Sequence, residues 1–178
     1  MRMELHASFD SGLEYEASPI DEMDYAIEAS PETADKIIFF VAGEPVPQGS
    51  TKGFYIEKIN RVVITHGNAN TTRWRERIAT EAQRADASRK ARFFDLDREA
   101  AYEVRVNFLF TRPKSMPKKR TLHTKRPDLD KLVRAVLDGI TDVLIPDDSQ
   151  VMSIAARKHY CLADEQPGLH IGVYRIEK

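Results

Sequence analysis

Two pairs of aspartates in one stretch of the sequence have the chemistry of a metal site. Asp128 and Asp130 are separated by one residue, and Asp147 and Asp148 are adjacent. Carboxylate oxygens are the ligands that hard divalent cations take in proteins, and a bound cation would relieve the repulsion between neighbouring carboxylates. Two simpler interpretations stay open. One aspartate of the first pair can cap a helix, and Asp147 and Asp148 are ordinary turn residues.

Cations are concentrated directly before the first aspartate pair. Residues 112–126 contain seven of them: Arg112, Lys114, Lys118, Lys119, Arg120, Lys125 and Arg126. Cations beside a group of carboxylates suit a substrate with a phosphate backbone, because a metal neutralises the reacting phosphate while the cations hold its neighbours. A solvated loop is the simpler alternative. We expect Lys118, Lys119, Arg120, Lys125 and Arg126 to position such a substrate.

Two more cations follow the first aspartate pair on the same predicted helix. Arg134 lies four residues after Asp130, which is the spacing of an ordinary ion pair on a helix surface. Alternatively, Arg134 or Lys131 stabilises the charge that develops on a reacting phosphate.

The sequence lacks the motifs of several other chemistries. The five histidines have no metal-ligand spacing, and His123 is interpreted as a loop residue with phosphate contact as an alternative. Cys161 is the single cysteine, so neither an internal disulfide nor a cysteine zinc cluster is expected. We find no phosphate-binding glycine loop, which argues against a nucleotide cofactor, and no G-x-S-x-G motif.

The elements around the aspartates must bring them into one site. A helix is predicted over residues 128–140, with its apolar face made of Leu129, Leu132, Val133, Val136, Leu137 and Ile140. Residues 101–110 alternate like a strand with Tyr102, Val104, Val106, Phe108 and Phe110 on one face. A further strand is predicted over 151–160. We expect the chain to return through this strand, so that Asp148 approaches the start of the helix and the carboxylates converge.

The remaining segments indicate an α+β domain. The apolar run 36–42 predicts a strand buried on both faces, and 54–56 with 61–65 predicts a hairpin around Lys58–Asn60. A helix is expected from Thr71 or Thr72 to about Ala87, and a last strand over 169–176. Strands outnumber helices, so we predict a small mixed β-sheet with two main helices.

The net charge of −1 over 178 residues conceals two regions of opposite charge. Residues 1–35 carry ten acidic side chains and one basic side chain, a sum of −9, and the remainder sums to +8. We therefore predict an acidic, mostly disordered extension over 1–35 and one basic domain over 36–178. A basic domain is a candidate for a polyanionic partner, although an ordinary solvated surface also explains the charge. No membrane span or secretory signal is found, so a cytoplasmic protein without a membrane partner is expected.

These residues resemble the RusA family of Holliday-junction resolvases, which bacteria and phages carry. The segment RPDLDKLVRAVLDGITDVLIPDDSQV (126–151) carries the likeness, and VAGEPVPQGSTKGF (41–54) and FTRPKS (110–115) occur in the same order as in the family. The likeness covers residues 36–178. It implies a RusA-like, intertwined homodimer that cuts four-way DNA junctions symmetrically in DNA recombination and repair, with Mg²⁺ as cofactor and Mn²⁺ as a substitute.

By position, the resemblance implies that Asp128, Asp130 and Asp148 hold the metal and act in catalysis. Where the family often has an asparagine and a catalytic lysine on the helix, this chain has Lys131 and Arg134. Arginine keeps the charge but cannot donate a proton at neutral pH, so we expect an electrostatic role for Arg134. Three alternatives are a non-catalytic junction-binding protein on the same scaffold, a D-x-D glycosyltransferase and a purely structural protein.

Overall fold

The computed structural model describes residues 35–49, 52–65, 69–94, 97–117, 122–162 and 165–176. The predicted acidic extension over 1–35 lies outside these residues, apart from Asp35. So do Lys118, Lys119 and Arg120. No helix of the described segments is both long and apolar enough to cross a bilayer.

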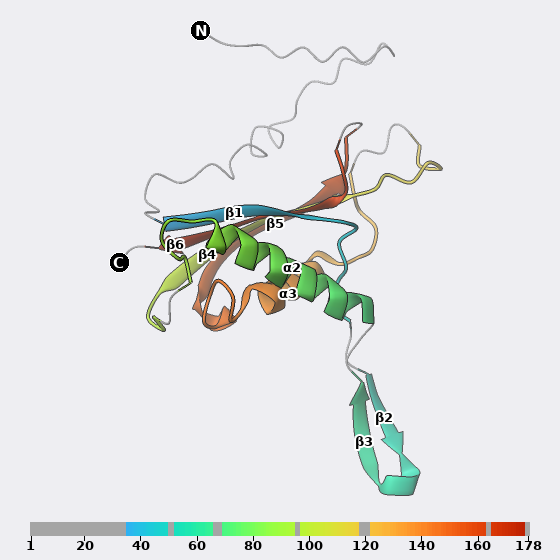
Figure 1. Ribbon diagram of the computed structural model, residues 1–178. Helices are drawn as coiled ribbons and strands as arrows, with labels where there is room; N and C mark the ends of the chain where they lie inside the picture. Colours follow the sequence, from blue (N-terminus) through green and yellow to red (C-terminus); the bar gives the residue numbers. More distant parts are fainter. Residues whose placement is uncertain are drawn as a thin grey trace. The chain divides into compact units, whose positions relative to one another are not determined.

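A four-stranded mixed sheet forms the centre of the domain (Figure 1). Its strands are β1 (Asp35–Ala42), β4 (Ala101–Phe110), β5 (Val151–Tyr160) and β6 (Gly168–Ile176), in the order β1-β6-β4-β5. β6 pairs antiparallel with both β1 and β4, whereas β4 and β5 are parallel. A parallel neighbour requires a crossover, and the helix between β4 and β5 supplies it. The α+β class with a mixed sheet is confirmed.

Two helices cover one face of this sheet (Figure 1). α2 (Ala69–Ala87) packs on β1 and on α3 (Leu129–Ile140), and α3 also contacts β5. The apolar stripe predicted for α2 is confirmed, since Trp74, Ile78 and Ala82 are buried. The same holds for the alternating residues of β4, and Tyr102, Val104 and Phe108 are fully buried. The helix-facing side of the sheet is therefore the core of the domain.

The prediction that both faces of β1 are buried is wrong. Ile37 and Val41 are buried under α2, but Ile38 on the opposite face is 46% exposed. β1 is an edge strand, and the helices cover only one face of the sheet there. A run of apolar residues alone does not distinguish this situation from a central strand buried on both sides.

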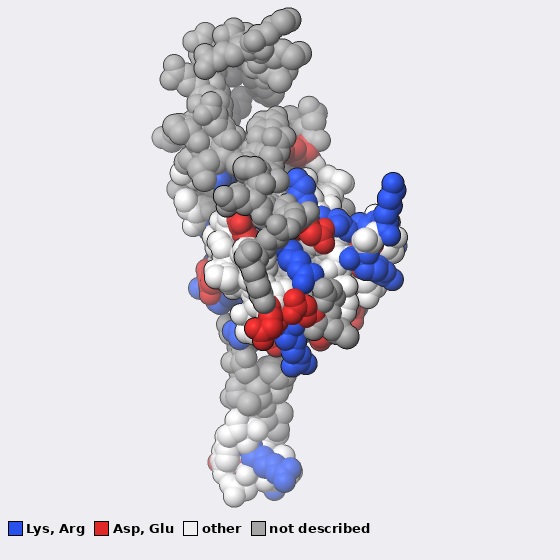
Figure 2. All heavy atoms as spheres, turned by 90° about the vertical axis from the view of Figure 1, so that its left-hand side faces the viewer, with Lys and Arg blue, Asp and Glu red and all other residues white. Residues whose placement is uncertain are grey.

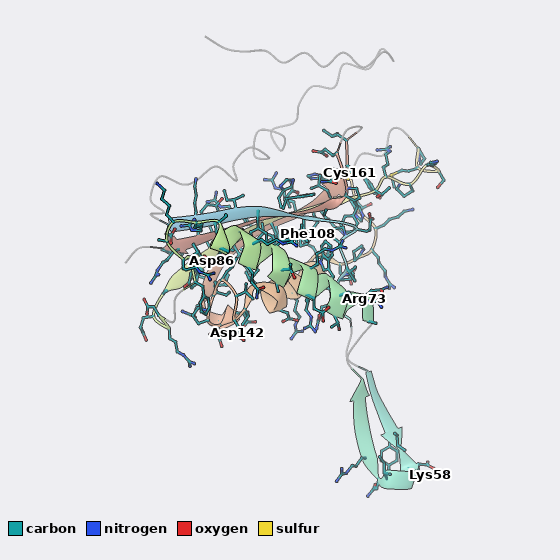
Figure 3. All side chains as sticks on the ribbon, in the orientation of Figure 1. Lys58, Arg73, Asp86, Phe108, Asp142 and Cys161 are labelled. Carbon is teal, nitrogen blue, oxygen red and sulfur yellow. The ribbon has the colours of Figure 1, made fainter. Side chains whose placement is uncertain are left out.

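The predicted hairpin forms a separate two-stranded sheet of β2 (Lys52–Ile56) and β3 (Arg61–Thr65). A 3₁₀ turn, η1 (Glu57–Ile59), joins the strands, and Asn60 completes the turn in the left-handed conformation with φ 48°. Lys58 lies in this turn (Figure 3). Asparagine tolerates positive φ well, which explains the reversal at this position.

Two contacts fix how α2 and α3 lie together. A Cβ atom added to Gly139 would lie 2.9 Å from Ile78 Cγ2, so only glycine allows the helices to approach this closely. Beside it, Arg75 donates to Asp138 across 3.1 Å. The two contacts position α3 and therefore the aspartates at its start.

Near the end of α2, a buried aspartate holds the following loop. Asp86 is 2% exposed and accepts hydrogen bonds from the backbone N–H of Phe93 (2.5 Å) and from Arg92 (2.9 Å). Figure 3 labels Asp86 on this part of the helix. Sequence reasoning did not single it out, because an aspartate near a helix end resembles a solvated surface residue.

Candidate active site

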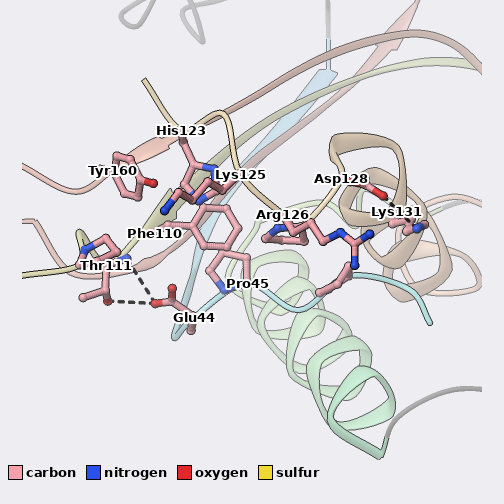
Figure 4. A pocket seen from close by; sticks show the side chains of 13 residues that line it. Glu44, Pro45, Phe110, Thr111, His123, Lys125, Arg126, Asp128, Lys131 and Tyr160 are labelled. Atoms are coloured by element: carbon pink, nitrogen blue, oxygen red, sulfur yellow. Dashed lines mark hydrogen bonds and ion pairs between the residues drawn. The ribbon is translucent and has the colours of Figure 1, made fainter. Parts of the chain in front are cut away.

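The first aspartate of the D-x-D pair begins α3. Asp128 has extended backbone angles, and its carbonyl accepts from the N–H of Leu132, as expected one residue before a helix. Its side chain makes no capping hydrogen bond, so the capping interpretation is wrong for this residue. The carboxylate instead accepts from Lys131 Nζ at 2.9 Å (Figure 4). The Asp128 carboxylate therefore takes Lys131, one turn along the helix, as its hydrogen-bond donor in place of the helix N–H groups.

The charges around Asp128 favour its ionised form. The hydrogen bond from Lys131 and the charge of that lysine lower the pKa of the Asp128 carboxyl, and the charges of Arg126 and Lys158 act in the same direction. The side chain is half-exposed. Asp128 is therefore an anionic oxygen ligand that solvent can reach.

Asp130 and Arg134 lie exposed on the next turns of α3. Among the described residues neither side chain has an ion-pair partner, so the predicted pair between them is not formed. Asp138, one turn further on, pairs with Arg75 of α2 instead. Asp130 and Arg134 are thus both available to a ligand at this end of the helix.

Lys158 of β5 anchors the loop that leads into α3. Its Nζ donates to the carbonyl of Lys125 at 2.7 Å and to the carbonyl of Pro127 at 2.6 Å. These bonds place the exposed Lys125 and Arg126 beside the start of α3. Sequence reasoning missed Lys158, because a single lysine in a strand carries no recognisable pattern.

A second chain segment holds α3 from the other side. The backbone N–H of Gln48 donates to the carbonyl of Lys131 at 2.8 Å, and Thr71 of α2 donates to the carbonyl of Pro47 at 3.0 Å. The proline-rich segment 43–49 is therefore fixed between the two helices. This gives a positional role to a stretch that the sequence identified only as turn-forming.

The second aspartate pair lies in η2 (Asp148–Gln150) and directly before it. Asp147 accepts from the N–H of Ser149 at 2.9 Å, and this hydrogen bonding lowers the pKa of its carboxyl, with a smaller effect from Arg98. The turn interpretation is confirmed for Asp147. Asp148 is exposed in the first turn of η2.

The two aspartate pairs lie at opposite ends of β5. Lys158 marks the end beside Asp128, and η2 precedes the other end at Val151. The seven residue steps between Val151 and Lys158 span roughly 23 Å at the usual rise of about 3.3 Å per residue. In agreement, the described residues contain no group of three His, Cys, Asp or Glu side chains that could hold a metal ion. The expected convergence of the carboxylates does not occur within one chain, because the crossover places α3 alongside β5.

A pocket of about 730 Å³ opens beside Asp128 (Figure 4). Phe110, His123 and Tyr160 line it together with prolines, while Lys125, Arg126, Asp128 and Lys131 contribute charged groups. Glu44 Oε2 accepts from the backbone N–H of Thr111 (3.3 Å) and from its hydroxyl (2.9 Å). No sequence pattern predicted this pocket, because its residues come from four separate segments of the chain.

The surface charge is mixed over the face drawn in Figure 2. Lysine and arginine side chains alternate there with acidic ones. On this face the excess of cations in residues 36–178 does not form one continuous basic field.

The site thus combines exposed carboxylates at a helix start, the exposed cations Lys125, Arg126 and Arg134 on either side of them, and an aromatic-lined pocket. No curated protein matches the chain. The sequence pattern of a family described as endodeoxyribonuclease RusA matches residues 42–174, which include every described residue of this site. The protein belongs to the RusA endodeoxyribonuclease family.

Proposed function

We propose that the protein is a Mg²⁺-dependent endodeoxyribonuclease that resolves Holliday junctions by paired, symmetric cleavage as a homodimer. The observation that carries the proposal is the start of α3. There the ionised Asp128 and the exposed Asp130 lie next to Lys125, Arg126 and Arg134. This juxtaposition of oxygen ligands and cations suits a metal and a phosphodiester at the same place.

The three proposed metal ligands, Asp128, Asp130 and Asp148, suit Mg²⁺ in their chemistry. Their positions in one chain are too far apart, so a second copy of the chain is needed to bring them together. Asp128, Asp130 and Asp148 supply exposed carboxylate oxygens, which are the ligands that this ion prefers. In one chain Asp148 lies at the far end of β5 from the other two. A homodimer in which the two ends of β5 meet would complete the ligand set.

The edge of the sheet supports such a dimer. β5 is an edge strand of ten residues, with Met152 75% and Ile154 43% exposed. Long edge strands with exposed apolar side chains are sites of pairing with another chain. Two β5 strands paired about a two-fold axis perpendicular to them run antiparallel, so each strand start meets the other strand's end. That arrangement carries Asp148 of one copy toward Asp128 and Asp130 of the other.

In the proposed reaction the chain's own residues bind and orient the phosphate. When bound, Mg²⁺ supplies an activated water and neutralises phosphate charge. Asp128 would hold the ion, and Lys131, its present ion-pair partner, would then be free to contact a phosphate oxygen. Arg134 stabilises developing negative charge without exchanging a proton. Lys125 and Arg126 hold the adjacent backbone, and Lys118, Lys119 and Arg120 are proposed to extend this contact.

Cleavage of a labelled synthetic four-way junction tests the proposal, with linear duplex as the control substrate. We expect paired symmetric nicks with Mg²⁺, no nicks with EDTA, and no nicks with Asp130→Asn. Asp142→Asn is the matched control, because Asp142 is exposed outside the site and asparagine tolerates its φ of 62°. Tight junction binding without cleavage under any divalent metal would instead establish a non-catalytic junction-binding protein.

A further inference from the structure

The pocket beside Asp128 contains a polar atom that lacks a partner. His123 is 9% exposed, and its ring packs between Phe110 and Tyr160 with centroids 4.5 and 4.6 Å away (Figure 4). Its buried Nδ1 has no hydrogen-bond partner within the described part of the chain. Buried polar atoms in proteins are nearly always paired, and an unpaired one reduces stability. A ligand that hydrogen-bonds to this imidazole would remove that cost.

The imidazole is suited to a neutral ligand. Burial lowers the pKa of His123, and the charge of Lys158 lowers it further, against the opposing effects of a hydrogen bond with its own backbone and of the charge of Glu44. A neutral imidazole carries one donor and one acceptor nitrogen. It therefore matches the edge of a heterocycle, on which donors and acceptors alternate, better than it matches a phosphate.

The rest of the pocket has the features of a nucleotide site. Its volume of about 730 Å³ lies within the range of small-molecule sites, about 300–1,000 Å³. The buried rings of Phe110, His123 and Tyr160 give the pocket an apolar wall, and Lys125, Arg126 and Lys131 stand beside it for a phosphate. Thr111 holds Glu44 through one carboxylate oxygen, which leaves the other oxygen as an acceptor for an exocyclic amino group.

We propose that this pocket receives an unstacked nucleobase of the DNA strand next to the cleaved phosphate, with His123 and Glu44 hydrogen-bonding to the edge of the base. Enzymes that flip a nucleotide out of the duplex hold its base in a cavity between aromatic or apolar side chains. The DNA context of this inference rests on the proposed function. The pocket is then a base-specific subsite, and His123 and Glu44 set the base preference.

Titration of the full chain with 2′-deoxynucleoside 5′-monophosphates tests the subsite without any cleavage. The His123 ring protons are followed by NMR, and deoxyribose 5-phosphate is the control ligand. We expect nucleotides to shift these signals at concentrations where the sugar phosphate does not. A base with an amino group should bind more tightly than thymine. Equal effects of nucleotides and sugar phosphate, or no effect of either, would overturn the inference.

His123→Phe keeps the ring packing and removes the nitrogens. We expect it to weaken nucleotide binding about threefold to tenfold, the range of one hydrogen bond between neutral groups. His170→Phe is the matched control, because His170 is also partly buried and stacked on a phenylalanine (Phe40, 4.6 Å) but lies outside the pocket. Equal weakening by both substitutions would count against the subsite.

Cleavage of junctions with each base next to the cut separates this inference from the proposed function. We expect Glu44→Gln to change the base preference, while Glu76→Gln on the exposed face of α2 leaves it unchanged. Junction cleavage without nucleotide binding would refute the subsite and leave the nuclease intact. Nucleotide binding without cleavage would retain the subsite and refute the proposed function.

Discussion

Subunit complementation gives the sharpest test of a site shared between two copies of the chain. One copy carries Asp130→Asn and the other Asp148→Asn, and the two are co-expressed with different tags. Roughly 23 Å separates Val151, next to Asp148, from Lys158, next to the start of α3, at about 3.3 Å per residue, so one chain cannot bring both side chains to one ion. If the ligands come from two chains, a heterodimer has one site with both substitutions and one site with neither.

The expected recovery follows from this geometry. Random pairing makes about half of all dimers heterodimers, and each has one intact site of two, so about one quarter of wild-type sites are restored. Each active heterodimer should nick one strand, because its second site is defective. The assay counts single and paired nicks on a labelled four-way junction.

The homodimers of each variant serve as the inactive controls. Nicking that stays at the level of either variant alone, in heterodimers shown by their two tags, would refute the shared site. The carboxylates would then have to meet within one chain, against the register of β4 and β5.

Three further predictions concern single side chains. Asp86→Ala should lower the free energy of unfolding by about 1–3 kcal/mol, because it leaves the buried N–H of Phe93 unpaired; urea unfolding measures this. Lys131→Met should raise the pKa of Asp128, which an NMR pH titration of its carboxyl carbon measures. In the wild type this pKa is lowered, so the stabilisation from the pair is present above the unfolded-state pKa and is lost as the pH falls through the folded-state value. Lys125→Ala should make the slope of log affinity for junction DNA against log salt less steep by about 1, measured in EDTA.

Each of these predictions has a matched comparison. Glu81→Ala removes only a surface ion pair with Arg84 and should cost less than about 1 kcal/mol, so an equal loss would weaken the account of Asp86. An unchanged Asp128 pKa would contradict the dominant role of Lys131. Lys90→Ala, an exposed cation away from the site, should leave the salt slope unchanged.

Local sequence patterns predicted the positions of the elements well. β4 and β5 occur at their predicted residues, and α3 begins one residue later than expected because Asp128 precedes the helix. β4 and α3 have a clear period of two or 3.6 residues, whereas the side chains of β5 are mostly exposed or half-buried on both faces. Such periods identify which residues face the core, and they carry no information on which strands become neighbours.

The candidate site was predictable in its residue types and only partly in its geometry. The chemistry of Asp128 and Asp130 follows from their positions at one helix start. The distance to Asp148 depends on the parallel pairing of β4 and β5, which no local pattern encodes. The pocket around His123 could not be predicted for the same reason, since strand ends and loops far apart in sequence build it.

The close approach of α2 and α3 at Gly139 fixes the rotation of α3 about its own axis relative to α2. A helix behaves as a stiff rod, and the nine residues from Asp130 to Gly139 span about 14 Å at about 1.5 Å each. Any side chain at position 139 must push against Ile78, and the rod would carry this displacement to the D-x-D pair. The orientation of the aspartate-bearing end of α3 is thus set at the opposite end of the helix. A mutation at position 139 would therefore alter the proposed active site without lying in it.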